Sequence, residues 1–321
     1  MIEVNKYILK TLEKSTSKLS NQAIKRIKEF LMLQLHHDGG FMDRAGNSDP
    51  YYSVFGYTLA FILDLEVPVN KQLIFVERWS DKNEIDFIHA VSLVQCKILI
   101  SAMQLKSKGS SAGQFFQSKF ISERVRKNIV KDVVQKSDDL LRIIESYRSQ
   151  NNGYNQSFKN ADYASTYATF LAWSLFQDLG LLVDEAELLK SIQDLQKENG
   201  SFVNERNSSS GVTTATAAGL IMSKSLQVVN IEKSISWLKE RWINQGGFVA
   251  AEGLPIADLL STSTALLALK MADNSLVNYS EACTDFINMH WDNSGGFFGS
   301  VADMHPDCEY TYYALLALGL I

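Results

Sequence analysis

The chain has 321 residues, of which 46% are hydrophobic and 21% charged, proportions typical of a globular protein with an ample core. Its formal net charge of −5 argues against nucleic acid or an anionic membrane as a partner. The three cysteines (Cys96, Cys283 and Cys308) form no close pair in the sequence, which argues against a disulfide framework or a Cys-based zinc cluster. We therefore expect a cytoplasmic protein.

Residues 1–20 lack the apolar run and cleavage site of a secretory signal, and we expect them to form an N-terminal extension. Residues 87–105 are apolar enough to raise the question of a membrane span. This stretch carries His89, Gln95 and Lys97, so the pattern favours a helix buried inside a soluble protein and no membrane span.

A short glycine-rich marker that ends in an aromatic residue recurs along the chain. The aromatic residues are Phe41, Tyr154, Phe202, Phe248 and Phe297, and from Tyr154 onward they follow at nearly equal intervals. The longer gap between Phe41 and Tyr154 leaves room for one further unit whose marker has decayed. Regular self-similarity of this kind indicates a repeat architecture. The glycines are typical of a tight turn that requires positive φ.

Each unit has an amphipathic helix before the marker and a markedly apolar helix after it. The amphipathic helices are predicted at 21–36, 185–197, 231–242 and 280–290, and the apolar helices at 51–63, 86–103, 162–179, 213–225, 259–271 and 308–320. Helices that are apolar all round are buried, whereas those with one polar face form an outer layer. The sequence therefore predicts an all-α protein with the (α/α)6 toroid fold, a closed ring of six inner and six outer helices. No period-two alternation predicts a sheet, and one domain over residues 1–321 is expected.

The openings of the inner helices carry an acidic residue followed four positions later by a small hydroxyl residue. The pairs are Asp49 with Ser53, Asp162 with Thr166, Asp258 with Thr262 and Asp307 with Thr311; Ser210 with Thr214 is a variant, and Asp86 opens the remaining helix. One interpretation is helix capping. The other is that several carboxylates face one opening of the ring, where they could perform acid–base chemistry.

Aromatic residues are concentrated in the inner helices, and eight of the twelve tyrosines lie in three helix openings. A wall of aromatic faces suits an apolar or polyene ligand and can stabilise a carbocation. The alternative is that these are large core residues whose hydroxyls are satisfied. The candidate substrate-binding residues are Tyr51, Tyr52, Phe55, Tyr163, Tyr167, Trp173, Tyr310 and Tyr313.

Two segments carry a resemblance to a known family. Residues 162–168, Asp-Tyr-Ala-Ser-Thr-Tyr-Ala, look like an inner-helix opening of prenyltransferase β-subunits, and Gln34 with Gly39-Gly40-Phe41 is similar to the repeat of triterpene cyclases. From about Asn21 onward the chain thus resembles the prenyltransferase β-subunit and squalene-cyclase (terpene cyclase) repeat superfamily. The resemblance implies a toroid with a central cavity for an isoprenoid or another apolar small molecule. It also implies a possible protein partner.

The catalytic signatures of this superfamily are degenerate here. Where the β-subunits carry zinc on an Asp-x-Cys pair and a later His, this chain has Asp258, Leu260 and Tyr310, so neither a metal nor another cofactor is expected. The segment 249–257, which should hold basic residues for a diphosphate, contains no Lys or Arg. These differences argue against zinc-dependent protein prenylation.

The closest approach to the acidic motif of class II cyclases is Asp307-Cys308-Glu309-Tyr310-Thr311, with Glu309 in the central position. A glutamate in an aromatic pocket can have a raised pKa and serve as a general acid. The alternative is that Glu309 only complements the dipole of its helix. The candidate catalytic residues are Glu309, Asp307 and Asp258.

Three interpretations of the function remain open. The first is a metal-independent enzyme, related to prenyltransferases or terpene cyclases, that acts on an isoprenoid or other apolar substrate. The second is a non-catalytic toroid that binds a ligand or a protein partner. The third is a carbohydrate-active enzyme, which would need a polar cleft with two carboxylates about 5–9.5 Å apart.

Overall fold

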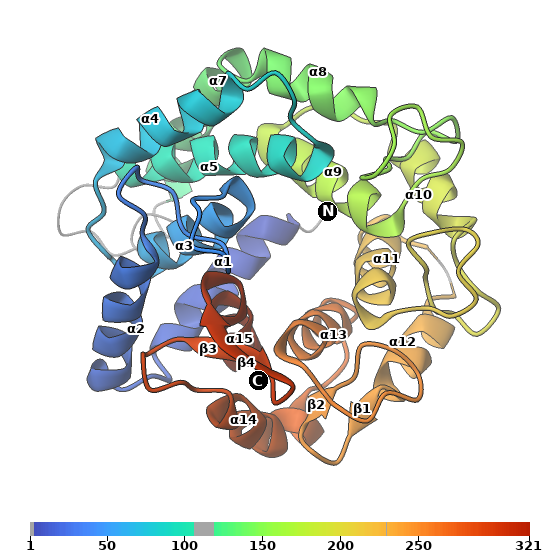
Figure 1. Ribbon diagram of the computed structural model, residues 1–321. Helices are drawn as coiled ribbons and strands as arrows, with labels where there is room; N and C mark the ends of the chain where they lie inside the picture. Colours follow the sequence, from blue (N-terminus) through green and yellow to red (C-terminus); the bar gives the residue numbers. More distant parts are fainter. Residues whose placement is uncertain (1–2, 106–118, 229) are drawn as a thin grey trace.

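The inner layer of the ring consists of six apolar helices that run in the same direction. A computed structural model describes residues 3–105, 119–228 and 230–321 of the chain (Figure 1). The inner helices are α3 (Pro50–Ile62), α5 (Phe87–Leu105), α9 (Thr166–Leu179), α11 (Thr213–Ser225), α13 (Leu259–Met271) and α15 (Cys308–Leu320). The first and last of them, α3 and α15, pack against each other, so the ring is closed. The predicted toroid is confirmed.

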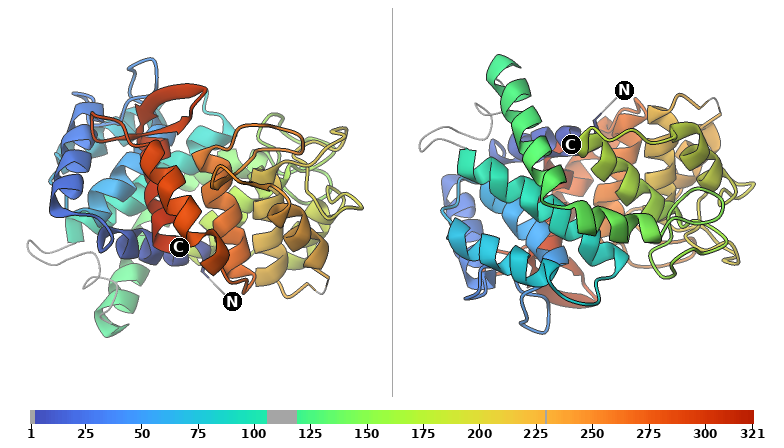
Figure 2. Two further views of the ribbon diagram at one scale, coloured as in Figure 1. Left: turned by 90° about the horizontal axis from the view of Figure 1, so that it is seen from below. Right: turned by 90° about the horizontal axis from the view of Figure 1, so that it is seen from above.

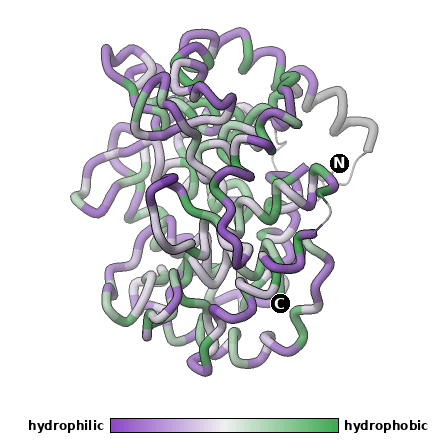
Figure 3. The backbone as a smooth tube through the Cα atoms, turned by 90° about the vertical axis from the view of Figure 1, so that its right-hand side faces the viewer, coloured by the Kyte–Doolittle hydropathy of each residue, from purple (hydrophilic) through white to green (hydrophobic). Residues whose placement is uncertain are grey.

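The outer layer consists of helices that precede each inner helix in the chain. They are α2 (Asn21–Gln34), α4 (Val69–Ser80), α7 (Lys119–Gln135), α8 (Asp138–Ser146), α10 (Glu185–Gln193), α12 (Glu232–Lys239) and α14 (Ser280–Met289), the last preceded by a 3-10 turn, η1 (Val277–Tyr279). Apolar and polar segments alternate along the chain (Figure 3), as expected when apolar inner helices are paired with charge-bearing outer helices.

The glycine-rich markers form tight turns with positive φ, as predicted. The turn residues with positive φ are Gly39, Gly200, Gly246 and Gly295, and Asn152 takes this role in the third unit. A Cβ atom on Gly295 would collide with the backbone carbonyl of Arg26. Because Arg26 belongs to α2, the last marker packs directly against the first outer helix, and this contact closes the outer layer.

The aromatic residue of each marker is fixed to its inner helix by one backbone hydrogen bond. The N–H groups of Phe41, Tyr154, Phe202, Phe248 and Phe297 donate to the hydroxyls of Ser53, Thr169, Thr216, Thr262 and Thr311, at 2.8 to 3.1 Å. In two units the accepting hydroxyl is not the one in the sequence pattern: Thr169 and Thr216 accept the bond, and Thr166 and Thr214 do not. The accepting residue lies four positions after the N-cap of each helix, which is Ser165 for α9 and Val212 for α11.

Two short antiparallel ribbons accompany the last two markers, although no strand was predicted. They are β1 (Trp242–Ile243) with β2 (Gly247–Phe248), and β3 (Phe297–Ser300) with β4 (Asp303–Asp307). Strands of two to five residues are too short to show a period-two pattern.

The N-terminal helix α1 (Val4–Thr16) packs across the end of the ring that lies opposite the openings of the inner helices. It contacts α15, α3 and α9. Lys14 Nζ donates to the carbonyl of Gly319 at 3.0 Å, and Asn5 Nδ2 donates to Asp178 Oδ2 at 2.6 Å. Both chain termini lie at this end, and the β3–β4 hairpin lies at the other (Figure 2). Helix α1 thus covers one end of the central cavity.

Helix α5 is long and apolar enough to cross a membrane by length and composition alone. In this fold it is an inner helix of the ring, where it packs against α3, α4 and α8. Half of its most apolar window is buried inside the protein. The apolar character of α5 therefore has a packing explanation.

Candidate functional site

A central cavity of about 290 Å³ lies inside the ring and is lined by side chains from all six inner helices. Its top layer, at the end where the inner helices begin, includes Tyr51, Ile88, Tyr167 and Leu260. Its floor, at the opposite end, is completed by Ile8 of α1. Leu260 and Leu267 lie about two turns apart on α13, so the cavity extends about 10 Å along the ring axis. No Lys, Arg, Asp or Glu is found among the described residues that line it.

One wall of the cavity is aromatic and is formed by α3 and α15. The ring of Phe55 makes edge contacts with Tyr51 and Tyr312 at centroid distances of 5.0 and 5.1 Å. Tyr313 packs against Phe55 at 5.8 Å and against Tyr312 at 5.4 Å. Edge-to-face contacts of this kind hold aromatic side chains in fixed orientations. The result is a rigid apolar wall.

Glu309 is joined to this wall by a hydrogen bond from Tyr51. The Tyr51 hydroxyl donates to Glu309 Oε1 at 2.6 Å. Burial raises the pKa of Glu309 to about 7, against the opposing effects of the Tyr51 hydrogen bond and of the Arg44 charge. Near neutral pH a large fraction of Glu309 is therefore protonated. Tyr51, which lines the cavity, lies between this carboxyl group and any bound ligand.

Asp307 is occupied by structural contacts. Its carboxylate accepts a hydrogen bond from the N–H of Tyr310 at 2.8 Å, which caps α15, and from Arg44 Nε at 3.0 Å. Arg44 also pairs with Asp303, and its guanidinium lies 5.2 Å from the centroid of the Tyr310 ring. These contacts tie the loop after α2 to the β3–β4 hairpin. Asp307 is thus a cap and an ion-pair partner.

Asp258 also acts as a helix cap. Its carboxylate accepts from the N–H of Ser261 at 2.7 Å, and burial raises its pKa. Asp258 does not line the central cavity or its mouth. Of the three predicted catalytic residues, only Glu309 is therefore brought to the cavity, through Tyr51.

The mouth of the cavity is a more open pocket of about 420 Å³ with an acidic lining. It is formed by Asp43, Asp49, Tyr51, Tyr52, Ile88, His89 and Tyr167. Three of these residues, Tyr51, Ile88 and Tyr167, also line the inner cavity. The two pockets therefore share one layer of side chains.

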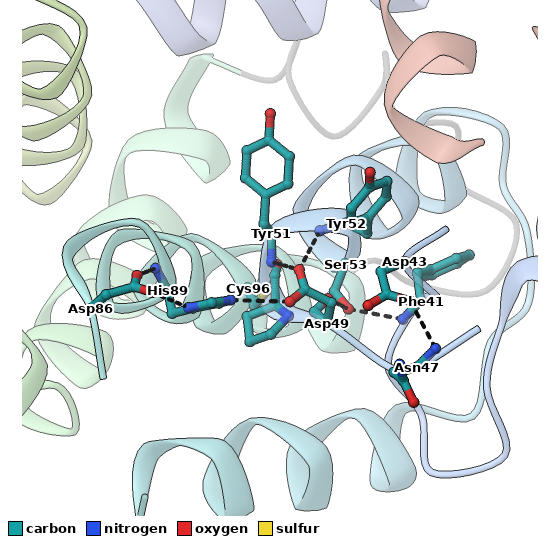
Figure 4. A network of polar contacts seen from close by, with 11 residues as sticks. Phe41, Asp43, Asn47, Asp49, Tyr51, Tyr52, Ser53, Asp86, His89 and Cys96 are labelled. Atoms are coloured by element: carbon teal, nitrogen blue, oxygen red, sulfur yellow. Dashed lines mark hydrogen bonds and ion pairs between the residues drawn. The ribbon is translucent and has the colours of Figure 1, made fainter. Parts of the chain in front are cut away.

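A histidine between two carboxylates fixes one side of the mouth (Figure 4). His89 Nδ1 lies 2.7 Å from Asp86 Oδ2, and His89 Nε2 lies 3.0 Å from Asp49 Oδ2. These hydrogen bonds raise the pKa of His89 to about 9, so the ring is an imidazolium at neutral pH. Asp49 also caps α3 by accepting from the N–H groups of Tyr51 and Tyr52. The network joins the openings of α3 and α5. It contains one positive charge, on His89, and two negative charges, on Asp49 and Asp86.

Sequence reasoning missed His89. The available signal was its position three residues after Asp86, the acidic residue that opens α5. At this spacing both the backbone N–H and the ring Nδ1 of His89 can reach the Asp86 carboxylate. The contact with Asp49 joins two separate helices, and no local pattern predicts it.

The aromatic residues predicted to bind substrate divide into two groups. Tyr51, Phe55, Tyr167 and Tyr313 line the inner cavity, and Tyr52 lines the mouth. The cavity wall also contains Phe170 and Tyr312, which were not among the predicted binding residues.

Three of the predicted residues do not reach the cavity, and their assignment is corrected here. Tyr163 is 41% exposed in the loop before α9, and Arg206 lies over its ring at 4.0 Å. Trp173 is fully buried on the outer side of α9, where Nε1 donates to Glu185 at 3.3 Å. The ring of Tyr310 lies under Arg44. For Trp173 and Tyr310, rotation about the helix axis by about 100° per residue separates these positions from the lining residues, whereas Tyr163 precedes the start of α9.

The positions at which the sequence resemblance would place a zinc site do not offer a suitable donor set. Leu260 is a lining residue of the cavity, Tyr310 packs under Arg44, and Asp258 caps α13. Among the residues that the structure describes, no three His, Cys, Asp or Glu side chains converge on one point. A tetrahedral zinc site needs such convergence.

The comparisons with known proteins agree with this fold. A family model, the prenyltransferase alpha-alpha toroid domain, matches residues 7–90, 119–253 and 212–321. The structure is similar to that of Candida albicans protein geranylgeranyltransferase-I complexed with GGPP, with a TM-score of 0.61 and 13% identity over 92% of this chain and 90% of that chain. It is also similar to the apo type II terpene cyclase MstE from Scytonema, with a TM-score of 0.56 and 10% identity over 96% of this chain and 98% of that chain. Comparison with curated protein sequences gives no match. The matched segments cover most of the sequence, and the chain belongs to the prenyltransferase alpha-alpha toroid family.

Proposed function

We propose that this protein binds a neutral isoprenoid, or another apolar molecule of similar size, in its central cavity. The observation that carries the proposal is a cavity enclosed by all six inner helices, with an aromatic wall and no charged side chain among its described lining residues. Concave, mostly apolar pockets with a few polar groups are the usual form of small-molecule sites. The relative complexed with GGPP makes an isoprenoid the first class of ligand to consider.

The charges around the mouth favour a neutral ligand over a diphosphate. Asp43 and Asp49 line the mouth, and the charge of His89 is matched by Asp49 and Asp86. Arg44 is already paired with Asp303 and Asp307. A diphosphate at this position would meet net negative charge, which is unfavourable in a partly desolvated site.

A second candidate function is acid catalysis on the bound ligand by Glu309 through Tyr51. The raised pKa of Glu309 and its hydrogen bond with the Tyr51 hydroxyl favour this function. In such a step protonated Glu309 becomes the donor of this hydrogen bond, and the Tyr51 hydroxyl turns to the cavity and donates its proton to a ligand oxygen. Protonated Glu309 replaces that proton and is left as a carboxylate, so the protons balance. Its test is product analysis with an isoprenoid alcohol: Glu309→Gln should retain binding and lose any turnover, and unchanged turnover would contradict the role.

The other interpretations have less support. A carbohydrate-active enzyme needs two carboxylates in a polar cleft, whereas the described lining of the inner cavity has none. A protein partner stays a prediction. The outer helices α2 and α4 expose Leu33 and Ile74, and isolated exposed apolar residues are common on protein surfaces.

The binding proposal can be tested by competition for the cavity. Displacement of the neutral fluorophore N-phenylnaphthylamine would be measured with farnesol and with farnesyl diphosphate. Ala218 lies in the cavity wall and Ala186 is exposed on α10, so Ala218→Trp fills the cavity and Ala186→Trp is the matched control. We expect farnesol to bind more tightly than the diphosphate, and Ala218→Trp alone to weaken it at least about tenfold. Equal binding by both variants would place the ligand elsewhere, and tighter binding of the diphosphate would refute the preference for a neutral ligand.

A further inference from the structure

The floor of the central cavity is apolar on one side and polar on the other. On the side of α11, α13 and α15 the deepest lining residues are Ile221, Leu267 and Leu316. On the side of α5 and α9 the same depth is occupied by Gln95 and Ser174. A site for a pure hydrocarbon would not need polar groups at its enclosed end, because such groups lose hydration when a ligand covers them.

Gln95 and Ser92 place unpaired hydrogen-bonding groups against this polar side. They are three residues apart on α5 and share the face that lines the cavity. Neither side chain makes a hydrogen bond with any residue in the described part of the chain, whereas Ser174 donates to the carbonyl of Leu171 at 3.0 Å. An amide and a hydroxyl that no described protein group pairs can take a hydrogen-bond partner from inside the cavity, either water or a polar group of a ligand that displaces it.

Helix α1 adds a third polar group to the floor. Asn5 lines the cavity beside Ile8, and its Nδ2 donates to Asp178 Oδ2 at 2.6 Å. This bond fixes the amide group and leaves its Oδ1 available, since no described residue donates to it. The floor therefore offers donors from Gln95 and Ser92, and acceptors from Gln95 and Asn5.

The chemistry of this floor selects a neutral oxygen group. A hydroxyl both donates and accepts, and a carbonyl accepts, so Gln95 and Ser92 can satisfy either. An anionic group would find no cation among the described lining residues.

We propose that Gln95, Ser92 and Asn5 form a polar subsite that binds a hydroxyl or carbonyl group at the buried end of an apolar ligand. This inference rests on the proposed function, because it names the class of ligand that the same cavity takes: a terpenoid alcohol or ketone rather than a hydrocarbon. The ligand enters with its oxygen toward α1 and its apolar body against the aromatic wall.

The test compares two ligands that differ in one hydroxyl group, limonene and perillyl alcohol. Their affinities would be measured by displacement of N-phenylnaphthylamine from the wild-type protein, from Gln95→Leu and from the control Gln193→Leu, which makes the same change at an exposed position on α10. We expect Gln95→Leu to weaken perillyl alcohol about five- to tenfold while limonene binds equally or more tightly. The control should leave the ratio of the two affinities unchanged.

The possible failures are distinguishable. If Gln95→Leu changes the affinities of both ligands by the same factor, the polar subsite is refuted and the apolar cavity stands. If neither ligand binds the wild-type protein, the proposed function fails and the subsite with it. Ser92→Ala, which removes only one oxygen atom, repeats the comparison should Gln95→Leu fold poorly; the same selective loss for the alcohol is expected, and an equal effect on both ligands would overturn the subsite.

Discussion

Replacing Glu309 by glutamine should stabilise the protein above neutral pH and leave its stability nearly unchanged in acid. Burial raises the pKa of Glu309 from 4.5 to about 7 in the folded protein. A carboxyl whose folded-state pKa is raised binds its proton more tightly in the native state, so its contribution to stability falls as pH rises from about 4.5 to about 7. Over that range the wild-type protein should lose roughly 3 kcal/mol relative to Glu309→Gln. Glutamine keeps an oxygen that can accept from Tyr51.

The assay is urea unfolding of both proteins at about pH 5 and about pH 8.5, with the free energies of unfolding compared at each pH. Because other groups titrate equally in both proteins, the difference between them reports Glu309. Tyr51→Phe is the informative control, because it removes the hydrogen bond that lowers the pKa of Glu309. In this variant the loss of stability on ionisation of Glu309 should therefore continue to a higher pH than in the wild type. A difference between wild type and Glu309→Gln that is the same at both pH values would refute the reasoning.

Two further predictions concern the mouth and the ring closure. His89→Gln should lower the free energy of unfolding by roughly 1–2 kcal/mol below pH 6.5, after allowance for partial solvent screening. This loss should vanish above about pH 9, where wild-type His89 loses its proton. A loss in urea unfolding that does not depend on pH would contradict the ion-pair account. Gly295→Ala should lower the melting temperature more than Gly253→Ala, because both glycines have positive φ but only Gly295 abuts Arg26; equal losses would argue against closure at Gly295.

Much of the ring was predictable because the hydrophobic pattern of its helices is strong. The predicted inner helices 213–225, 259–271 and 308–320 have the bounds of α11, α13 and α15. The opening of α9 was misplaced because Asp162 and Ser165 are both good caps, and the sequence alone does not choose between them. That shift also leaves Tyr163 in an exposed loop.

The site was harder to predict because its contacts join distant parts of the chain. Tyr51 and Glu309 are 258 residues apart, and their contact exists only once α3 and α15 are neighbours. Arg44, which occupies Asp307, lies in a loop with no sequence signal for its partner. Which aromatic residues face inward depends on the rotation of each helix, so composition identified an aromatic cavity but not every member of its wall.

The central claim is that the enclosed cavity between the mouth and α1 takes an apolar ligand. A crystal structure of the protein grown with perillyl alcohol tests it most directly. The account predicts density for the ligand inside the ring, between Tyr167 at the top and Ile8 at the floor, against the wall formed by Phe55 and Tyr313. A cavity that contains only ordered water, with the ligand bound on the outer surface or absent, would contradict it.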